Sequence, residues 1–112
     1  MTEDIYKEIA ELDKAIHERA RLAIMTLLYH HREVSFNYLR QALQATEGNL
    51  ATHLRTLEDA DYIEVTKRFR GKRPETTYRI SEKGRKEYKK YLQSLEKLLE
   101  KEREWPSDRI RD

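Results

Sequence analysis

The side chains best suited to chemistry in this sequence are hydrogen-bond donors and cations, and they gather in two stretches. Residues 46–56 carry threonine, asparagine and arginine between leucines, and five of the seven residues 67–73 are Lys or Arg. Hydroxyl, amide and guanidinium groups donate hydrogen bonds to anionic oxygens and to the polar edges of ring systems. The chemistry that these stretches indicate is the binding of a polar, anionic partner.

The sequence lacks the patterns on which catalysis and metal binding depend. It has no nucleophile elbow, no phosphate-cradling glycine loop and no metal-ligand spacing. It also has no cysteine, which excludes disulfides and thiolate ligands and fits a reducing cytoplasm. The adjacent His30 and His31 point to different sides of a helix end, so a solvated terminus is favoured over a metal site. We expect no enzyme, no catalytic residue, no metal and no cofactor.

The first stretch has the pattern of a helix with one buried face. Leu50, Leu54 and Leu57 recur at the spacing of a helical stripe. Thr46 can cap this helix, because its hydroxyl accepts a hydrogen bond from a first-turn N–H group. An ordinary amphipathic surface helix would have the same pattern. The candidate contact residues are the cap and the face turned away from the leucines: Thr46, Gly48, Asn49, Thr52, Arg55 and Thr56.

The second stretch lies inside a predicted β-hairpin. Ile63 and Val65 alternate with polar residues, and Tyr78 and Ile80 do so again after the basic segment. Glycine and proline between these strands indicate a bend. The basic candidates on both sides of the bend are Lys67, Arg68, Arg70, Lys72 and Arg73.

Another short helix is predicted just before the helix capped by Thr46. Residues 34–36 look extended, Ser35 can cap the helix that follows, and this helix should run from Phe36 to about Gln44. Two short helices joined so tightly form a helix-turn-helix, and a hairpin packed directly after them is a wing. The fold class is therefore mainly α with a small β-hairpin wing, a winged helix-turn-helix with long terminal helices.

This arrangement fits double-stranded DNA as the partner. Asn49 and Thr52 stand near the end of the helix that enters the major groove, whereas Arg55 lies further along and suits a phosphate. Tyr38 could reach a phosphate as well, and the wing cations suit the backbone or the minor groove. His53, at the margin of the leucine stripe, is expected to bond inside the domain, with a DNA contact as the alternative. A protein-binding winged helix and sequence-indifferent architectural binding also remain open.

The terminal helices carry narrow apolar stripes that suit pairing with a second chain. Docking on the same domain is the alternative for both. The stripes, which are the predicted homodimer interface, consist of Ile5, Ile9, Leu12 and Ile16 in the first helix and Tyr88, Tyr91, Leu95 and Leu98 in the last. The chain then divides into a dimerisation helix (1–17), a winged-helix core (18–80), a second dimerisation helix (81–105) ended by Trp105-Pro106, and a tail (106–112).

Composition sets the remaining bounds. The chain of 112 residues suits one domain, and 39% of its residues are charged although the net charge is only +2. Its longest apolar run, Leu22 to Tyr29, is interrupted by Thr26 and is too short to span a membrane. No signal peptide is visible. We expect a cytoplasmic protein without a membrane partner.

The ordered combination of these elements resembles the winged-helix regulators of the MarR, ArsR and PadR type. The likeness is densest in residues 49–63 and in Tyr78–Gly84, which is similar to the exit from their wing. Residues 12–17 and 69–74 look closest to a compact single-domain archaeal and bacterial subgroup. The resemblance implies a homodimeric DNA-binding regulator joined by its terminal helices, and it leaves a small-molecule effector open. Gly48, Ala51 and Thr52 stand where such helices often carry Ser or Gln, which implies thinner direct reading of bases.

Overall fold

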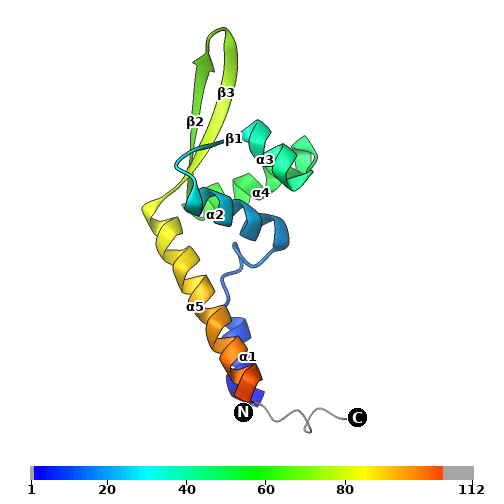
Figure 1. The fold of residues 1–112 in the computed structure, drawn as a ribbon, viewed down its shortest axis with the longest axis vertical. Helices are drawn as coiled ribbons and strands as arrows, with labels where there is room; N and C mark the ends of the chain where they lie inside the picture. The colour runs from blue at the N-terminus through cyan, green and yellow to red at the C-terminus, as the bar shows by residue number, and fades with distance from the viewer. Residues whose placement is uncertain (1, 105–112) are drawn as a thin grey trace.

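A helix-turn-helix with its hairpin stands at one end of the molecule, and a pair of helices forms the other end. The computed structural model describes residues 2–104 and is 63 Å long and 28 Å by 21 Å across (Figure 1). Its elements are α1 (Thr2–Ala10), α2 (Arg19–His30), β1 (Val34–Ser35), α3 (Phe36–Leu43), α4 (Glu47–Asp59), β2 (Ile63–Arg70), β3 (Arg73–Ile80) and α5 (Glu82–Glu104). The predicted fold class, a mainly helical winged helix, is confirmed.

The helices begin where polar side chains cap them. The hydroxyl of Ser35 accepts a hydrogen bond from the Tyr38 N–H at 3.0 Å, and that of Thr46 accepts one from the Asn49 N–H at 3.2 Å. Ser81 caps α5 through the Gly84 N–H at 2.9 Å. Each cap satisfies an N–H group that has no partner within its own helix, which fixes where the helix starts. The three predicted caps are confirmed.

The three strands form one antiparallel sheet in the order β1-β3-β2. Strands β2 and β3 pair from Ile63↔Ile80 out to Arg70↔Arg73, so the turn between them is only Gly71 and Lys72. Gly71 has a φ of 67°, which glycine adopts without strain. The sequence placed the basic residues between the two strands, on both sides of the bend, and this is corrected. Ladder pairing continues through them, so all except Lys72 lie on the strands. We call β2, β3 and their turn the wing.

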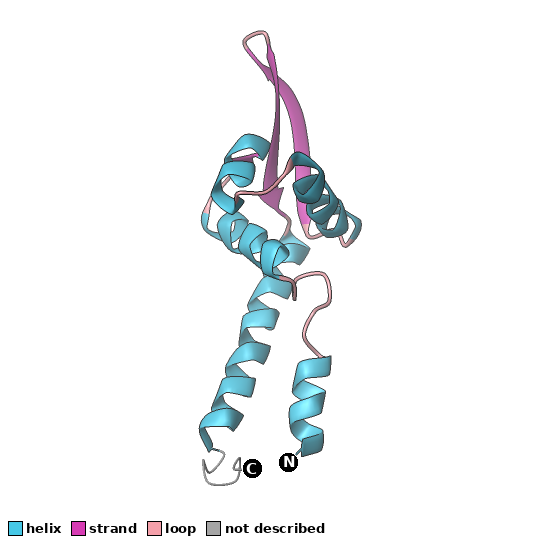
Figure 2. Ribbon diagram, turned by 90° about the vertical axis from the view of Figure 1, so that its right-hand side faces the viewer, coloured by secondary structure: helices cyan, strands magenta, loops and turns pink. Residues whose placement is uncertain are grey.

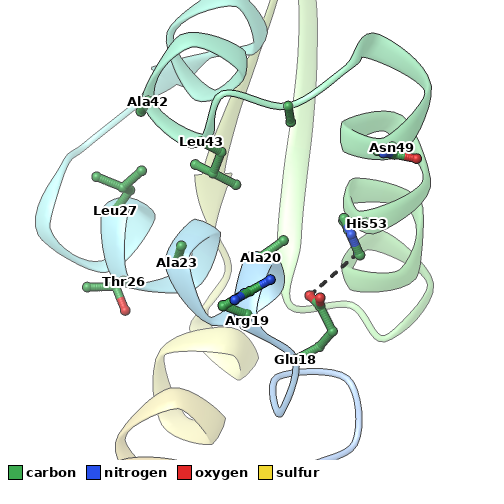
Figure 3. Close-up of a pocket in the computed structure, with 11 residues that line it drawn as sticks. Glu18, Arg19, Ala20, Ala23, Thr26, Leu27, Ala42, Leu43, Asn49 and His53 are labelled. Atoms are coloured by element: carbon green, nitrogen blue, oxygen red, sulfur yellow. Dashed lines mark ion pairs between the residues drawn. The ribbon is translucent and has the colours of Figure 1, made fainter.

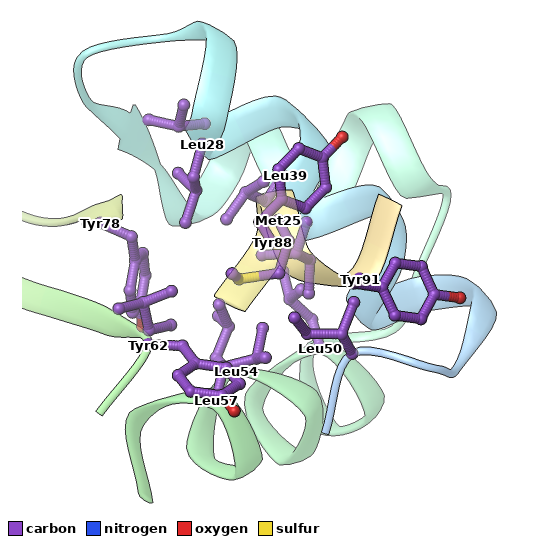
Figure 4. Packing of buried hydrophobic residues seen from close by; sticks show 14 of the residues in the cluster. Met25, Leu28, Leu39, Leu50, Leu54, Leu57, Tyr62, Tyr78, Tyr88 and Tyr91 are labelled. Atoms are coloured by element: carbon purple, nitrogen blue, oxygen red, sulfur yellow. The ribbon is translucent and has the colours of Figure 1, made fainter. Parts of the chain in front are cut away.

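The core lies where α2, α3 and α4 meet the base of the wing and the start of α5 (Figure 4). The leucine stripe of α4 is buried there, as predicted from its spacing. The largest fully buried side chains are Ile16, Ile24, Met25, Leu28, Leu39, Leu50, Leu54 and Leu57.

The first helix is shorter than the sequence pattern predicted. It was expected over residues 2–17, but α1 ends at Ala10. The carboxylate of Asp13 accepts hydrogen bonds from the N–H groups of Ala15 at 2.8 Å and Ile16 at 3.0 Å. An aspartate that bonds to the backbone two and three residues later favours a turn over a continuing helix. The segment 11–18 therefore bends, and α2 starts after Glu18.

This bend corrects the predicted dimer interface for two of its residues. Leu12 and Ile16 follow α1 and are buried in the core of their own chain, with Ile16 0% exposed. They cannot form a seam with another chain. Of the same predicted stripe, Ile5 on α1 is half-buried and Ile9 is exposed.

The predicted seam on the last helix is corrected in the same way. Tyr88 and Tyr91 are both buried within the chain. The hydroxyl of Tyr88 bonds to α2, and that of Tyr91 bonds to the segment just before α2. The Tyr88 hydroxyl lies 2.9 Å from Oγ1 of Thr26, and the Tyr91 hydroxyl lies 2.7 Å from Nδ1 of His17. These tyrosines hold α5 against its own domain. The expected helix end at Trp105-Pro106 and the expected tail lie outside the described residues.

Beyond the core, α5 continues with α1 beside it (Figures 1 and 2). Nζ of Lys101 lies 3.2 Å from Oε1 of Glu8, which ties the two helices together. We call α1 and the part of α5 beside it the stalk. The stalk and the wing lie at opposite ends of the molecule, and Figure 2 shows this from a second direction.

Candidate nucleic-acid interface

Helix α4 displays a polar face opposite its buried leucines. Glu47, Gly48, Asn49, Thr52 and Arg55 are exposed, and Thr56 is half-buried. With the described residues, the side chains of Asn49 and Arg55 form no hydrogen bond or ion pair. They are therefore available to an outside partner. Apart from Glu47, the residues of this face are positions that the sequence singled out. The fold brings them to one face because burial of the leucine stripe sets the orientation of the helix about its axis.

The two threonines of this face are partly committed to their own helix. Oγ1 of Thr52 donates to the Gly48 carbonyl at 3.0 Å, and Oγ1 of Thr56 donates to the Thr52 carbonyl at 3.2 Å. With its proton used, a threonine oxygen can still accept a hydrogen bond, and its methyl group can make an apolar contact. Thr52 is thus suited to donors such as the amino groups of cytosine or adenine, or to a thymine methyl group.

Gly48 is not required by the packing of the domain. A Cβ built at this position would meet nothing within 4 Å. Glycine costs about 1 kcal/mol relative to alanine inside a helix. The exposed backbone at Gly48 therefore weakens α4 without a compensating contact inside the described residues.

His53 turns inward, as its place beside the leucine stripe suggested. Its Nδ1 lies 3.1 Å from Nη1 of Arg21 and 3.7 Å from Oε1 of Glu18, which caps α2 (Figure 3). Partial burial raises the pKa of Glu18. Backbone hydrogen bonds from the first turn of α2, together with the charges of His53 and Arg21, outweigh that effect, so the pKa lies below its ordinary value. The contact joins the start of α2 to the middle of α4.

A cleft of about 820 Å³ opens beside this contact (Figure 3). Its apolar wall comes from α2 and α3, and Asn49 and His53 line it from α4. The lining residues are Glu18, Arg19, Ala20, Ala23, Thr26, Leu27, Ala42, Leu43, Ala45, Asn49 and His53. The cleft borders the same helix whose outer face carries the candidate contact residues.

Helix α3 contributes one candidate of its own. Tyr38 is 49% exposed in the first turn of α3, and its ring lies 6.5 Å from that of His31. Within the described residues its hydroxyl forms no hydrogen bond, so it can donate to an outside partner. Tyr38 was named from the sequence as a phosphate contact, and its exposure is compatible with that role.

One wing cation is held by the domain. Arg68 on β2 forms an ion pair with Glu33, which lies between α2 and β1. The hydroxyl of Thr77 on β3 also donates to Oε2 of Glu33, at 3.0 Å. The hydrogen bond from Thr77, followed by that from Arg68, holds the pKa of Glu33 below its ordinary value. This cluster fixes the middle of the wing to the loop after α2, and no local pattern of residues indicated it.

The other wing cations are more open. Arg70 lies 3.5 Å from Glu75 but remains largely exposed. Lys67, Lys72 and Arg73 are exposed and form no ion pair with residues of the described part of the chain. Among these cations stands Phe69, whose side chain is 73% exposed. Phe69 was not among the contact residues predicted from the sequence. An aromatic residue inside a run of cations was nevertheless an indication that it could contact the same partner.

A protein-family model described as a winged helix DNA-binding domain matches residues 20–99. The match covers α2 through most of α5, including the helix-turn-helix and the wing. The chain belongs to this family. An uncharacterized protein of Methanocaldococcus jannaschii is 35% identical to this winged-helix protein over 85 residues, which are 76% of this chain and 92% of that protein.

Solved structures agree with this assignment. A transcriptional regulator homologue from Pyrococcus horikoshii OT3 is 31% identical, has a TM-score of 0.78, and covers 87% of this chain and 95% of its own. The Staphylococcus aureus MepR–DNA complex has a TM-score of 0.69 at 17% identity, over 91% of this chain and 84% of that one. A putative MarR-like regulator from Bacillus cereus has a TM-score of 0.64 at 20% identity, over 96% and 81%. The last two share the fold.

Residues 2–104 contain no group of three or more His, Asp or Glu side chains placed to hold a metal ion. No helix in the same range is long and apolar enough to cross a membrane.

Proposed function

We propose that this winged-helix protein is a transcription regulator that binds specific sites in double-stranded DNA as a homodimer. Helix α4 enters the major groove, and the wing lies along the neighbouring backbone or minor groove. The observation that carries the proposal is the exposed, unpaired polar face of α4, with Asn49 and Arg55 open to solvent. In this proposal the protein acts in the cytoplasm.

The roles within α4 follow from what each side chain still offers. Asn49 presents both a donor and an acceptor, which suits adenine, and Thr52 presents an acceptor and a methyl group. Arg55, further along the helix, grips a phosphate. The capping residue Thr46 and the edge residue Thr56 border the contact, and Gly48 lets the backbone come close to the DNA.

The wing supplies the sequence-independent part of the binding. Lys67, Arg70, Lys72 and Arg73 neutralise phosphates, and Tyr38 on α3 adds a neutral donor. Arg68 acts differently in this proposal, because its guanidinium is already paired with Glu33. It positions the wing against the helix-turn-helix.

The dimer forms through the stalk. Within the chain, α5 buries Tyr88 and Tyr91 against the domain, while other apolar side chains of α1 and α5 stay open. Of the predicted interface, Ile5, Ile9, Leu95 and Leu98 remain at least partly exposed. Three further apolar side chains on these helices are exposed: Tyr6, Leu92 and Leu99. An exposed apolar surface on two projecting helices can pack against the same surface of a second copy of the chain. In such a dimer, the two winged helices can face one DNA site.

Selection of bound sequences from random duplex DNA tests the proposal. A regulator enriches one motif, and its two-fold symmetry appears as an inverted repeat with half-sites about one helical turn apart. Fluorescence anisotropy with the selected duplex and a scrambled duplex then measures the preference at fixed salt.

The result separates the competing classes. Binding without enrichment of any motif would identify an architectural DNA-binding protein. Failure to bind any duplex would leave the winged helix as a protein-interaction module. An enriched motif without repeat symmetry would contradict the homodimer and retain specific binding.

A further inference from the structure

The tip of the wing carries an apolar pair that the folded domain does not use. Phe69 on β2 lies directly opposite Pro74 on β3. Phe69 is 73% exposed, and Pro74 is exposed as well. Directly opposed residues in an antiparallel pair have their Cβ atoms close together, so the ring and the proline form one apolar surface.

This surface continues the face of the hairpin that enters the core. Side chains alternate along a strand, so Ile63, Val65, Lys67 and Phe69 share one face. Exposure rises along it, from 4% at Ile63 to 38% at Val65 and 73% at Phe69. The core covers the base of this face and ends before the tip, where the hairpin projects beyond the helices (Figure 1).

The surroundings of the pair indicate an anionic, groove-shaped partner. Arg70 follows Phe69 on β2, and Arg73 precedes Pro74 on β3. Lys72 lies in the turn between the two strands. A second protein surface would have to desolvate all these charges to reach the ring. A DNA groove offers phosphates on both walls and the apolar edges of sugars and bases at its floor.

We propose that Phe69, backed by Pro74, is a minor-groove wedge. It presses its ring against the sugars and base edges while the flanking cations hold the two phosphate walls. Apolar side chains that enter this groove partly unstack a base step and bend the duplex toward the major groove. The inference rests on the proposed DNA binding and adds that this protein reads the deformability of its site through the wing.

Deformability gives the wedge a sequence preference without a hydrogen bond. Pyrimidine–purine steps unstack more easily than other steps. We therefore expect such a step under each wing in the selected sites, at a position displaced from the bases that α4 contacts.

The test measures bending and unstacking on duplexes selected by the wild-type protein. Dyes at the two duplex ends report bending by energy transfer, and 2-aminopurine under the wing reports unstacking by increased fluorescence. Wild type should raise both signals. Phe69→Ala should bind about tenfold more weakly per wing, the factor for losing one aromatic contact with a base, and leave both signals near those of free DNA. Phe69→Leu, which keeps an apolar wedge, should retain most of the bend.

Val65→Ala is the matched control, because it shortens an apolar side chain on the same strand face closer to the core. It should bind and bend DNA as wild type does. The wedge is refuted if Phe69→Ala bends DNA as wild type does, or if wild type binds without bending. It is also refuted if Phe69→Ala changes only the sedimentation of the free protein, which would assign the ring to a protein contact. If wild type binds no duplex, the proposed function fails with it, a result distinct from all these.

Discussion

The hydroxyl of Thr77 donates a hydrogen bond to the carboxylate of Glu33 at 3.0 Å, across 44 residues of sequence. Arg68 pairs with the same carboxylate, so one side chain from the loop after α2 holds both strands of the wing. The wing is thereby fixed along its middle to the loop between α2 and β1, while the turn at its tip stays free.

This contact predicts how the wing responds to pH. The Thr77 and Arg68 groups hold the pKa of Glu33 below 4.5, its ordinary value. A carboxyl whose pKa is lower in the folded state contributes stability above its unfolded pKa and loses it as the pH falls through the folded pKa. NMR titration of the Glu33 carboxyl carbon should therefore show a midpoint below 4.5. Thr77→Val, which removes the largest lowering contribution, should raise it. An ordinary midpoint in the wild type would show that the cluster does not persist in solution.

The displayed face of α4 should divide into base and phosphate contacts. Asn49→Ala and Thr52→Ala should each relax the preference at particular base positions, by about 1–3 kcal/mol for a good contact. Arg55→Ala should weaken all sequences evenly, because a phosphate contact carries no sequence information. Binding measured against a panel of single-base variants of the selected site distinguishes the two patterns. If all three variants fold and bind as wild type does, another surface must read the DNA.

The free wing cations should set the salt dependence of binding. Each phosphate contact contributes about 0.9 to the slope of log K against log salt. Lys72→Ala combined with Arg73→Ala should thus flatten the slope by roughly 1–2 per wing if both contact phosphate. Arg68→Ala should change the slope less, because Glu33 already holds that guanidinium, and it serves as the comparison. A slope unchanged by the double substitution would remove the wing from the interface.

Gly48 should show opposite effects on stability and binding. Because a Cβ there meets nothing within 4 Å, Gly48→Ala should raise the free energy of unfolding by about 1 kcal/mol. The same methyl group would keep the helix backbone from the DNA, so affinity should fall as stability rises. Ala51→Gly, on the same exposed face, is the mirror control and should lower stability by about 1 kcal/mol. Tighter or unchanged DNA binding by Gly48→Ala would contradict the close approach of the backbone.

Dimerisation through the stalk can be tested at a residue that does not contribute to the folding of the monomer. Leu99 is 56% exposed on α5, whereas Leu95 packs partly against the core. Leu99→Glu should therefore leave the monomer folded but place an unpaired charge in the apolar dimer seam, which disfavours association. Sedimentation should show a monomer with an unchanged circular dichroism spectrum. Gln93→Glu adds the same charge at another exposed position of α5 and should remain dimeric. A wild type that sediments as a monomer would refute the dimer itself.

The sequence by itself determined the elements whose signals are local. The caps at Ser35, Thr46 and Ser81 bond to N–H groups three residues away, and the stripe of α4 needs only a helical period. Such patterns act within one or two turns, so they can be read directly. The helix-turn-helix, the hairpin and the displayed face of α4 followed from them.

Only the tertiary structure decided which partner each apolar stripe packs against. A stripe shows that a face is buried, but the spacing does not distinguish the chain's own core from a second chain. Asp13 bends the chain after α1 and turns Leu12 and Ile16 inward, and hydrogen bonds to His17 and Thr26 draw Tyr91 and Tyr88 onto the domain. The pairing of Arg68 with Glu33 and the exposure of Phe69 beyond the core also depend on contacts between distant residues. No local period encodes such contacts, because they form only when separate elements meet.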